Sequence, residues 1–442
     1  MSGSFENYDV GAKKRKGKAE SHTIDVPENG YMEEVEKAFW ERQSIYKLHS
    51  YVKDRYENTY NPLLVSIGPY HHGKEHLLPM EEHKRRAFSH FIKRSRLPVE
   101  DYKSALMEDV QTLKEAYEQL DGKYWVDTDK FIELMLVDGC FILEFMEILS
   151  GAPKDYAPND PIFSYYGCII HYSCVMRDLL LLENQLPYLV LEKLVLVSEQ
   201  RHLEPGEQRV PATLSQMMMF SPNMEPGRHM LDMYMMGLFQ GSRSIQNEDQ
   251  ILHLSASQLY QVGIEFKKVD SFNDICFDQS KGTLNLPHIN INDYSTSTFM
   301  NLKAFELRGT TSRDFNSYIR LMESLIKMPK DVKLLEMKGI IVHSLNSDEC
   351  VVKLLKNLER DTVVDKNCKS YMARQEMTVY YEGIMKQWKN GLKRHVVEWI
   401  SNLKQTYFSN PWSIISVVAA FCLLVLTVLQ TIYTIRSFYK QK

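Results

Sequence analysis

The residues best suited to chemistry lie in a histidine-rich stretch that begins at Gly68. The run from Gly68 to Lys74, GPYHHGK, fits the pattern G-x-x-x-x-G-K of a phosphate-binding loop and follows a strand-like segment. Glu75 stands where a Ser or Thr would hold magnesium, and its carboxylate would repel phosphate. Pro69 removes one backbone N–H from the anion cradle. The sequence therefore favours a structured turn whose Gly68 and Gly73 are set by backbone geometry.

Histidines from this stretch are candidate metal ligands. His71, His76 and His83 carry imidazole nitrogens that could ligate zinc. Their spacings are neither i, i+4 nor those of a known zinc finger, and neighbouring residues rarely point at one ion. Histidines that pack and form hydrogen bonds near a turn are the favoured interpretation, so we predict no metal site.

A second candidate is the run Cys168-x2-His171-x2-Cys174. On a helix, Cys168 and His171 share a face, and so do His171 and Cys174, but the two cysteines diverge. The apolar neighbours indicate buried small residues, and the structural interpretation is favoured over metal or thiol chemistry.

Charged and amide side chains interrupt a nearly unbroken apolar run that ends at Pro187. In such surroundings they must be paired or hydrogen-bonded. They could line a pocket, but the favoured hypothesis is a buried network that fixes how helices meet and satisfies the backbone freed by Pro187. Its predicted members are Arg177, Asp178, Glu183, Asn184 and Gln185.

Known catalytic signatures are absent from the chain, including G-x-S-x-G, H-E-x-x-H, C-x-x-C and G-x-G-x-x-G. We therefore expect no enzyme, no catalytic residue and no cofactor. The alternative that stays open is an enzyme with an unrecognised, metal-assisted pocket near the His-rich turn, because triads also assemble from distant residues.

The elements that would position these residues are mainly helical. Phe131–Leu149 is apolar on most sides and predicts a buried helix, and Val175–Leu196 predicts a second one interrupted at Pro187. Strand patterns occur at Gly263–Val269 and Thr283–Ile291. The pattern predicts a mainly α fold with a small antiparallel β element, in one large helical domain plus a single C-terminal transmembrane helix.

Length and charge limit the function further. The chain has 442 residues, and 53 Lys and Arg against 57 Asp and Glu give a net charge of −4, which argues against a nucleic-acid partner. Residues 1–30 contain a basic run without periodicity and predict a disordered arm. The globular domain is predicted over residues 31–404.

Residues 199–250 form an irregular excursion rich in Pro, Gly and Met. Eight of the 22 Met residues fall between Met217 and Met236, and adaptable thioether side chains suit a contact surface. The competing interpretation is a short helix near Met230–Leu238 that packs on the core.

No charged residue occurs between Gln405 and Ile435. Residues 412–433 would span about 33 Å as a helix, against a hydrocarbon core of about 30 Å. Trp412 and Tyr433 would mark its ends. We expect a single-pass tail anchor with the large domain in the cytosol and a short basic tail at 434–442. The odd number of Cys and the absence of N-x-Ser/Thr sites agree with the cytosol.

Several runs, in their order along the chain, resemble the plant domain-of-unknown-function 247 family. The runs are Val65–Gly73, Asp138–Phe141, Asp178–Pro187, Ala256–Phe266 and Asn301–Glu306. The resemblance implies a plant membrane protein with a large helical domain, one C-terminal span and no established enzymatic activity. Grass relatives are linked to pollen-side self-incompatibility, which implies recognition between proteins. The expected function is therefore protein recognition or signalling at a membrane through unknown protein partners. A scaffold that forms homo-oligomers is a further alternative.

Overall fold

The computed structural model describes residues 42–56, 58–120, 125–151, 155–199, 227–239, 254–309, 313–359, 368–407 and 411–440. The predicted arm at residues 1–30 lies outside the described residues. The chain divides into two units, Met1–Gln43 and Ser44–Lys442, and the helices and strands named below belong to the second. The predicted boundaries of the globular domain at 31 and 404 stay predictions.

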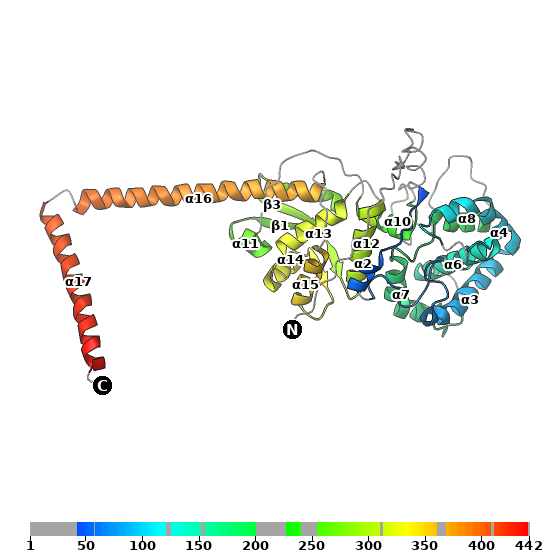
Figure 1. Cartoon of the computed structure of the whole chain (residues 1–442). Coiled ribbons are helices and arrows are strands. Elements are labelled where there is room, and N and C mark those ends of the chain that lie inside the picture. Colours follow the sequence, from blue (N-terminus) through cyan, green and yellow to red (C-terminus); the bar gives the residue numbers. More distant parts are fainter. Residues whose placement is uncertain are drawn as a thin grey trace, which may run out of the picture. The chain divides into compact units, whose positions relative to one another are not determined.

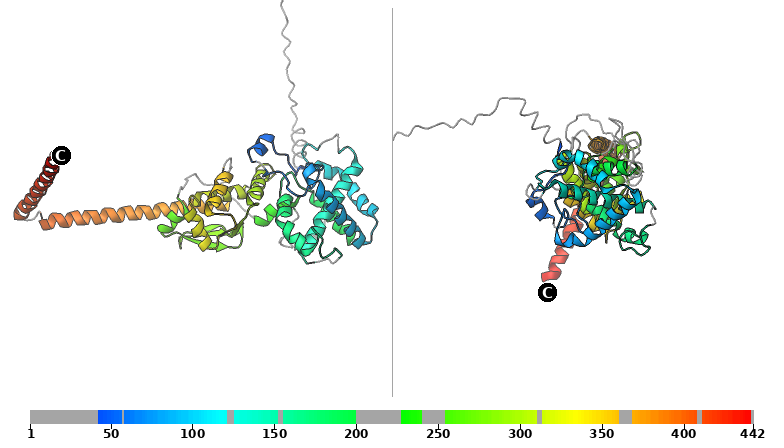
Figure 2. Two further views of the ribbon diagram at one scale, coloured as in Figure 1. Left: turned by 90° about the horizontal axis from the view of Figure 1, so that it is seen from below. Right: turned by 90° about the vertical axis from the view of Figure 1, so that its right-hand side faces the viewer.

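Short helices dominate the first half of this unit. They are α2 (Ser50–Arg55), η1 (Glu75–Leu77), α3 (Leu78–Ser95), α4 (Val99–Glu108), α5 (Val110–Glu115), α6 (Thr128–Leu149), α7 (Tyr165–Leu179) and α8 (Tyr188–Ser198). Apolar side chains of α3, α4, α6 and α8 meet in one core, in which Phe131, Phe141 and Leu186 are fully buried. The helices α3 and α6 lie side by side, as Figures 1 and 2 both show.

A second core is built from helices and short strands. Its elements are α10 (Met230–Leu238), α11 (Ala256–Gln261), β1 (Glu265–Val269), η2 (Phe272–Asp274), β2 (Cys276–Asp278), β3 (Thr283–Pro287), β4 (Ile289–Ile291), α12 (Ser295–Gly309), α13 (Asp314–Leu325), α14 (Pro329–Met337), β5 (Ile341–His343), α15 (Asp348–Glu359) and the start of α16 (Lys369–Tyr407). The last helix, α17 (Pro411–Lys440), adds none of its described side chains to this core. Phe305, Tyr318 and Leu335 are buried at its centre. The prediction of a mainly helical chain with few strands is confirmed.

The predicted buried helix at Phe131–Leu149 is confirmed as α6, one turn longer at its start. Asp127 ends the preceding loop and caps the helix, because its side chain accepts a hydrogen bond from Lys130 N at 3.2 Å. The helix is apolar on most sides, so it is covered on most sides. Glu144, a buried acid on α6, is paired with Arg94 of α3 through two bonds of 2.7 and 2.8 Å.

The helix predicted at Val175–Leu196 is interrupted before Pro187, as expected, but the interruption is longer than predicted. Two helices, α7 and α8, occupy this stretch, and residues 180–187 between them are not helical. Pro187 precedes the first residue of α8, where a proline fits because the N–H it lacks would have no partner inside the helix. The break begins at Leu180, seven residues before Pro187, since the amide and carboxylate side chains of this stretch bond to backbone elsewhere in the chain.

The predicted antiparallel β element needs correction. In the three-stranded sheet, ordered β1-β3-β2, only β2 and β3 run antiparallel, and β1 pairs with β3 in parallel. The strands β4 and β5 form a second, parallel pair, with Ile291 opposite His343. A short turn joins β2 to β3 and so makes them antiparallel, whereas the parallel partners are separated by longer connections.

The predicted transmembrane helix is also wrong. Residues 412–433 are helical within α17, but none of the helices over the described residues combines the length and the apolar character needed to cross a bilayer. The prediction rested on a run of 22 residues without charge, on its length as a helix and on the aromatic residues at its two ends. Trp412 and Tyr433 lie in α17, and their assignment as span ends is withdrawn with the span.

Most of the Met-rich excursion lies outside the described residues, including Met217. Its described part contains α10, which agrees with the predicted short helix at Met230–Leu238. Met230 and Met233 are buried against the first core. These methionines therefore fill the interior and are not free for a partner.

In the turn at residues 68–73, the backbone of Gly68 lies very close to the carbonyl oxygen of Gln185. Gly68 has φ +73°, and a Cβ atom at this position would lie 2.4 Å from the carbonyl oxygen of Gln185. Gly73 has φ +80°, but a Cβ there would meet nothing within 4 Å. The two glycines share the left-handed backbone and differ in the space around them.

Gly68→Ala should therefore destabilise the protein much more than Gly73→Ala. We expect Gly73→Ala to lower the free energy of unfolding by about 1 kcal/mol, the strain of a left-handed alanine. Gly68→Ala should lower the free energy of unfolding by about 1–3 kcal/mol more than Gly73→Ala does, because its backbone must also move away from Gln185. Urea unfolding of the two variants measures the difference, and equal losses would contradict the close approach.

Candidate functional site

A segment without regular secondary structure runs from Thr59 to Tyr70, and most of its residues are buried. Tyr60, Val65 and Ile67 are buried in it. A buried backbone needs hydrogen-bond partners, and neither a helix nor a sheet supplies them here. The sequence-predicted polar residues provide them.

Asp178 holds the middle of the segment. Its carboxylate accepts the backbone N–H groups of Leu63 at 3.0 Å, Leu64 at 2.7 Å and Val65 at 3.0 Å. Arg177 Nη1 donates to the same carboxylate at 2.6 Å. Burial raises the pKa of Asp178, and the backbone N–H groups and Arg177 oppose that rise. The Asp178 carboxylate therefore acts as a fixed hydrogen-bond acceptor for three consecutive backbone N–H groups.

Arg177 and Glu183 extend the same arrangement. Arg177 Nη1 also donates to the carbonyl of Asn61 at 3.0 Å. Glu183 accepts the backbone N–H of Leu48 at 2.6 Å and the ammonium group of Lys53 at 2.5 Å. Both side chains thus bind segments more than 100 residues earlier in the chain.

Asn184 and Gln185 complete the set. The Asn184 side chain accepts Ile67 N–H at 2.8 Å and donates to the Val65 carbonyl at 3.0 Å, as a neighbouring strand would. Gln185 Oε1 accepts Leu231 N–H at 3.1 Å, which connects the network to α10. All five sequence-predicted residues are buried, and each bonds to backbone. Hydrogen bonds connect four of them to one another, and Glu183 lies beside them along the chain.

Sequence reasoning missed the ion pair beneath this network. Lys84 and Asp138 are both fully buried, and Lys84 Nζ lies 2.5 Å from Asp138 Oδ1 and 2.9 Å from the Ser66 carbonyl. Asp138 Oδ2 accepts Gly68 N–H at 2.8 Å. Burial raises the pKa of Asp138, and Lys84 opposes the rise. The signal that could have found the pair is an acid inside an apolar helix, which requires a partner.

Removing one member of this pair should be costly. Asp138→Asn keeps an oxygen for Gly68 but leaves the Lys84 ammonium buried with less negative charge, so we expect a loss of about 3 kcal/mol or more in the free energy of unfolding. Glu81 Oε1, at 2.7 Å from Lys84 Nζ, still faces the ammonium group in this variant. Lys84→Met combined with Asp138→Asn should be more stable than Asp138→Asn alone, since the incompletely compensated buried charge is gone.

A matched control is Lys281→Met, which breaks an exposed pair with Asp278 of 3.2 Å. It should cost less than about 1 kcal/mol. Urea unfolding measures these three variants and Lys84→Met alone. A double variant that loses the sum of the two single losses would show that Lys84 and Asp138 do not act as a pair.

The three candidate histidine ligands have separate surroundings. His71 is buried, with Nε2 at 3.8 Å from Glu183 Oε2. His76 Nε2 lies 3.1 Å from the Pro62 carbonyl, and His83 Nδ1 lies 2.9 Å from Arg86. Within the described part of the chain these three side chains do not form a metal-competent group. The structure therefore does not bring the predicted candidates together.

His71 should make the stability of the protein sensitive to acid. Burial, with Lys74 and Lys53 as smaller causes, lowers the pKa of His71 to about 3. Unfolding returns the ring to an ordinary pKa of about 6.5, so the unfolded chain binds more protons below that pH. The stabilising contribution is complete above pH 6.5 and is lost as the pH falls towards 3.

The test compares wild type with His71→Gln by urea unfolding from pH 7 to pH 4. The difference in free energy of unfolding should change by up to about 1.4 kcal/mol per pH unit, with wild type losing more as the pH falls. Parallel curves for the two proteins would show that His71 is not held neutral.

The run from Cys168 to Cys174 does not provide reactive thiols. Cys168 is buried in α7, with Sγ 3.9 Å from the Phe145 carbonyl. Burial raises the pKa of Cys168 to about 12 and that of Cys174 to about 11. His171 Nδ1 lies 2.8 Å from the Gly167 carbonyl. Thiols that stay protonated are poor nucleophiles and metal ligands, so the residues pack and bond locally.

The opposite side of α7 is apolar and exposed. Tyr165, Tyr166, Ile169, Ile170 and Tyr172 expose 66, 74, 50, 74 and 44% of their surface. We call these five residues the outer face of α7. None is charged, and Arg177 and Asp178 of the same helix are buried. The sequence indicated buried small residues in this run, and Cys168 is buried; the Tyr and Ile side chains beside it are exposed. Tyr and Ile suit an interior and a contact surface equally.

Comparison with known proteins gives a family and no activity. A family model described as a plant protein of unknown function matches residues 45–426. A UPF0481 protein of Arabidopsis thaliana is 27% identical over 428 residues, which cover 87% of this chain and 84% of that protein. Another UPF0481 protein of the same plant is 21% identical over 499 residues, covering 88% of this chain and 89% of that protein. No solved structure matches.

Proposed function

Because this chain belongs to the plant domain-of-unknown-function 247 family, for which no reaction is known, we propose that it acts in protein–protein recognition through the outer face of α7. The observation that carries the proposal is the gathering of five exposed apolar side chains on one helix of 15 residues. Single exposed apolar residues are common on folded proteins, whereas a contiguous group marks an interaction site.

The composition of the face suits a protein partner. Three of its five residues are tyrosines, and Tyr is enriched in interfaces because it offers a large rigid surface with few rotatable bonds. Tyr165 and Tyr166 pack edge to face, with ring centroids 5.6 Å apart. The two rings therefore support each other before a partner arrives.

The other side of α7 holds the helix firmly. Cys168, Val175 and Leu179 are buried in the first core, and Ser164 caps the helix by accepting Gly167 N–H at 2.9 Å. Arg177 and Asp178, at the end of α7, are fixed by the buried network. A surface on a rigid element loses little conformational freedom on binding.

The lack of charge on the outer face of α7 limits the kind of partner that it can bind. The exposed residues of α7 carry no formal charge, so a charged partner surface would lose water there without gaining an ion pair. We commit to a separate protein that presents an apolar, uncharged surface. Protein recognition through unknown partners was also the expectation from the sequence, although the Met-rich segment was the surface preferred there.

Ile170→Lys should abolish this contact and leave the fold intact. Burying an isoleucine side chain is worth about 1.5–3 kcal/mol, so placing a charge there should weaken partner binding by at least about tenfold. Val126→Lys is the matched control, because Val126 is equally exposed, at 74%, and lies outside α7. Circular dichroism and urea unfolding check that both variants fold.

The partner can be found with a photo-crosslinking amino acid at position 166, and at position 126 as a control. The resemblance to grass relatives makes pollen the first tissue to use. The crosslinked protein is then purified, and its affinity for wild type, Ile170→Lys and Val126→Lys is measured. Equal binding to all three would overturn the proposal, and crosslinks only between copies of this chain would replace the separate partner with a homo-oligomer.

A further inference from the structure

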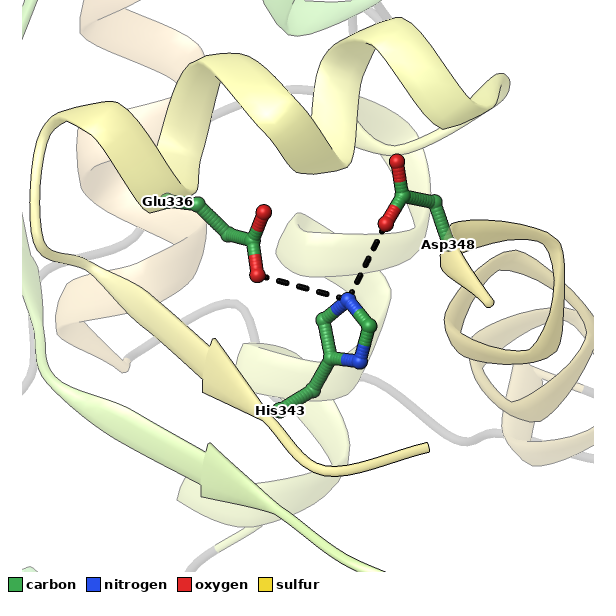
Figure 3. A group of neighbouring side chains, drawn as sticks. All are labelled: Glu336, His343 and Asp348. Atoms are coloured by element: carbon green, nitrogen blue, oxygen red, sulfur yellow. Dashed lines mark hydrogen bonds and ion pairs between the residues drawn. The ribbon is translucent and has the colours of Figure 1, made fainter. Parts of the chain in front are cut away.

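Three side chains capable of binding a metal ion converge between α14 and α15. Figure 3 shows Glu336 and Asp348 pointing at the imidazole of His343 from opposite sides. Glu336 comes from the last turn of α14, His343 is the final residue of β5, and Asp348 is the first residue of α15. These residues were not sequence candidates, since their spacing matches no known metal motif.

Both carboxylates face the same ring nitrogen. Nε2 of His343 lies 3.3 Å from Glu336 Oε1 and 3.1 Å from Asp348 Oδ1. The other nitrogen, Nδ1, is buried and has no hydrogen-bond partner among the described residues. One N–H bond can point well at only one acceptor, so a proton on Nε2 leaves one of the two carboxylates poorly bound.

Charge balance favours a cation over a proton at this position. Two carboxylates and a neutral imidazole carry a charge of −2, which a single proton reduces only to −1. A divalent ion neutralises it fully. The side chain of Lys338 is the nearest basic group along the chain, but its ammonium nitrogen pairs with Glu265 at 2.7 Å.

The distances fit the edges of a metal coordination shell. Zinc binds imidazole nitrogen and carboxylate oxygen at about 2.0–2.2 Å, so neighbouring ligands of a tetrahedral site lie about 3.4 Å apart. The ligand atoms of Glu336, His343 and Asp348 all lie within 4.8 Å of one another. We propose that these three residues bind one divalent transition-metal ion of the zinc type, with the remaining position open to water.

The backbone around the three ligands is well supported. Ile291 of β4 pairs with His343, and the carbonyl of Ile291 accepts Ser344 N–H at 2.9 Å. Gly339, with φ +70°, turns the chain from α14 into β5. Leu335 of α14 and Val351 of α15 are buried in the second core beside the ligands. Donors held on packed elements need little rearrangement to bind an ion.

Exposure leaves the site open to solvent ions. The His343 side chain is 8% exposed, whereas those of Glu336 and Asp348 are 33 and 28% exposed. Burial therefore fixes the imidazole ring of His343, whereas the carboxylates of Glu336 and Asp348 are accessible to solvent and can release water to bind a metal ion. This proposal is independent of the outer face of α7, so either can fail alone.

Zinc binding to the purified full-length chain tests the proposal, with titration calorimetry after treatment with a chelator. Wild type should bind one equivalent of zinc, and Glu336→Gln and His343→Ala should each weaken that binding by at least about tenfold. His288→Ala is the matched control, because His288 is exposed and its Nδ1 contacts the Gly339 carbonyl at 3.1 Å. It should bind zinc as wild type does.

Cobalt supplies a second readout. Co²⁺ in a four-coordinate site absorbs visible light strongly, and this band should appear with wild type and with His288→Ala but not with His343→Ala. If His343→Ala does not fold, Glu336→Gln and Asp348→Asn, which keep the shape of the site, decide the question. Zinc affinities that are the same in wild type and in the folded ligand variants would overturn the proposal.

Discussion

A stretch of buried backbone that belongs to no helix or sheet is the constraint on which the rest of this structure depends. Residues 65–69 lie in the interior, and each of their polar groups that lacks a partner would cost free energy. Asp178 and Asn184 supply those partners from the link between α7 and α8. The polar residues of an otherwise apolar region are therefore there to bind main chain.

The same solution joins the two cores. Asn301 of α12 is fully buried, accepts Leu182 N–H at 2.8 Å and donates to the Thr59 carbonyl at 3.2 Å. Ser297, one turn earlier, donates to the same carbonyl. Side-chain amides and hydroxyls thus bind the irregular segment from both sides, and the elements that surround it are held in register by these bonds as well as by apolar packing.

Part of this could be predicted from the sequence. Charged residues inside an apolar run had to be buried and paired, and all five predicted network residues lie in one buried cluster. Their partners could not be predicted, because Asp178 bonds to backbone amides more than 110 positions away, and an amide N–H has no residue type. For the same reason the sequence did not predict where the non-helical link between α7 and α8 begins. Its start depends on hydrogen bonds to main chain far away in the sequence.

Other features lay beyond sequence patterns for different reasons. The parallel pairing of β1 and β3 depends on how the connections fold, and alternation of residues looks the same in both directions. The outer face of α7 consists of Tyr and Ile, which are also common in a buried core, so the sequence does not show that it is exposed. Glu336, His343 and Asp348 meet only because α14, β5 and α15 pack on one another. An uncharged run with aromatic ends predicted a membrane span in α17, and none of the helices over the described residues meets the requirements for one.

The long separation within the buried network also has a consequence for protein synthesis. Leu64 leaves the ribosome 114 residues before Asp178, its hydrogen-bond partner. At about 5–20 residues per second, the segment waits roughly 6–23 seconds with its amides bound to water. Its apolar side chains are exposed to other chains during that interval, and such long-range contacts slow folding. The irregular segment therefore gains its buried hydrogen-bond partners only when residues 177–185 arrive.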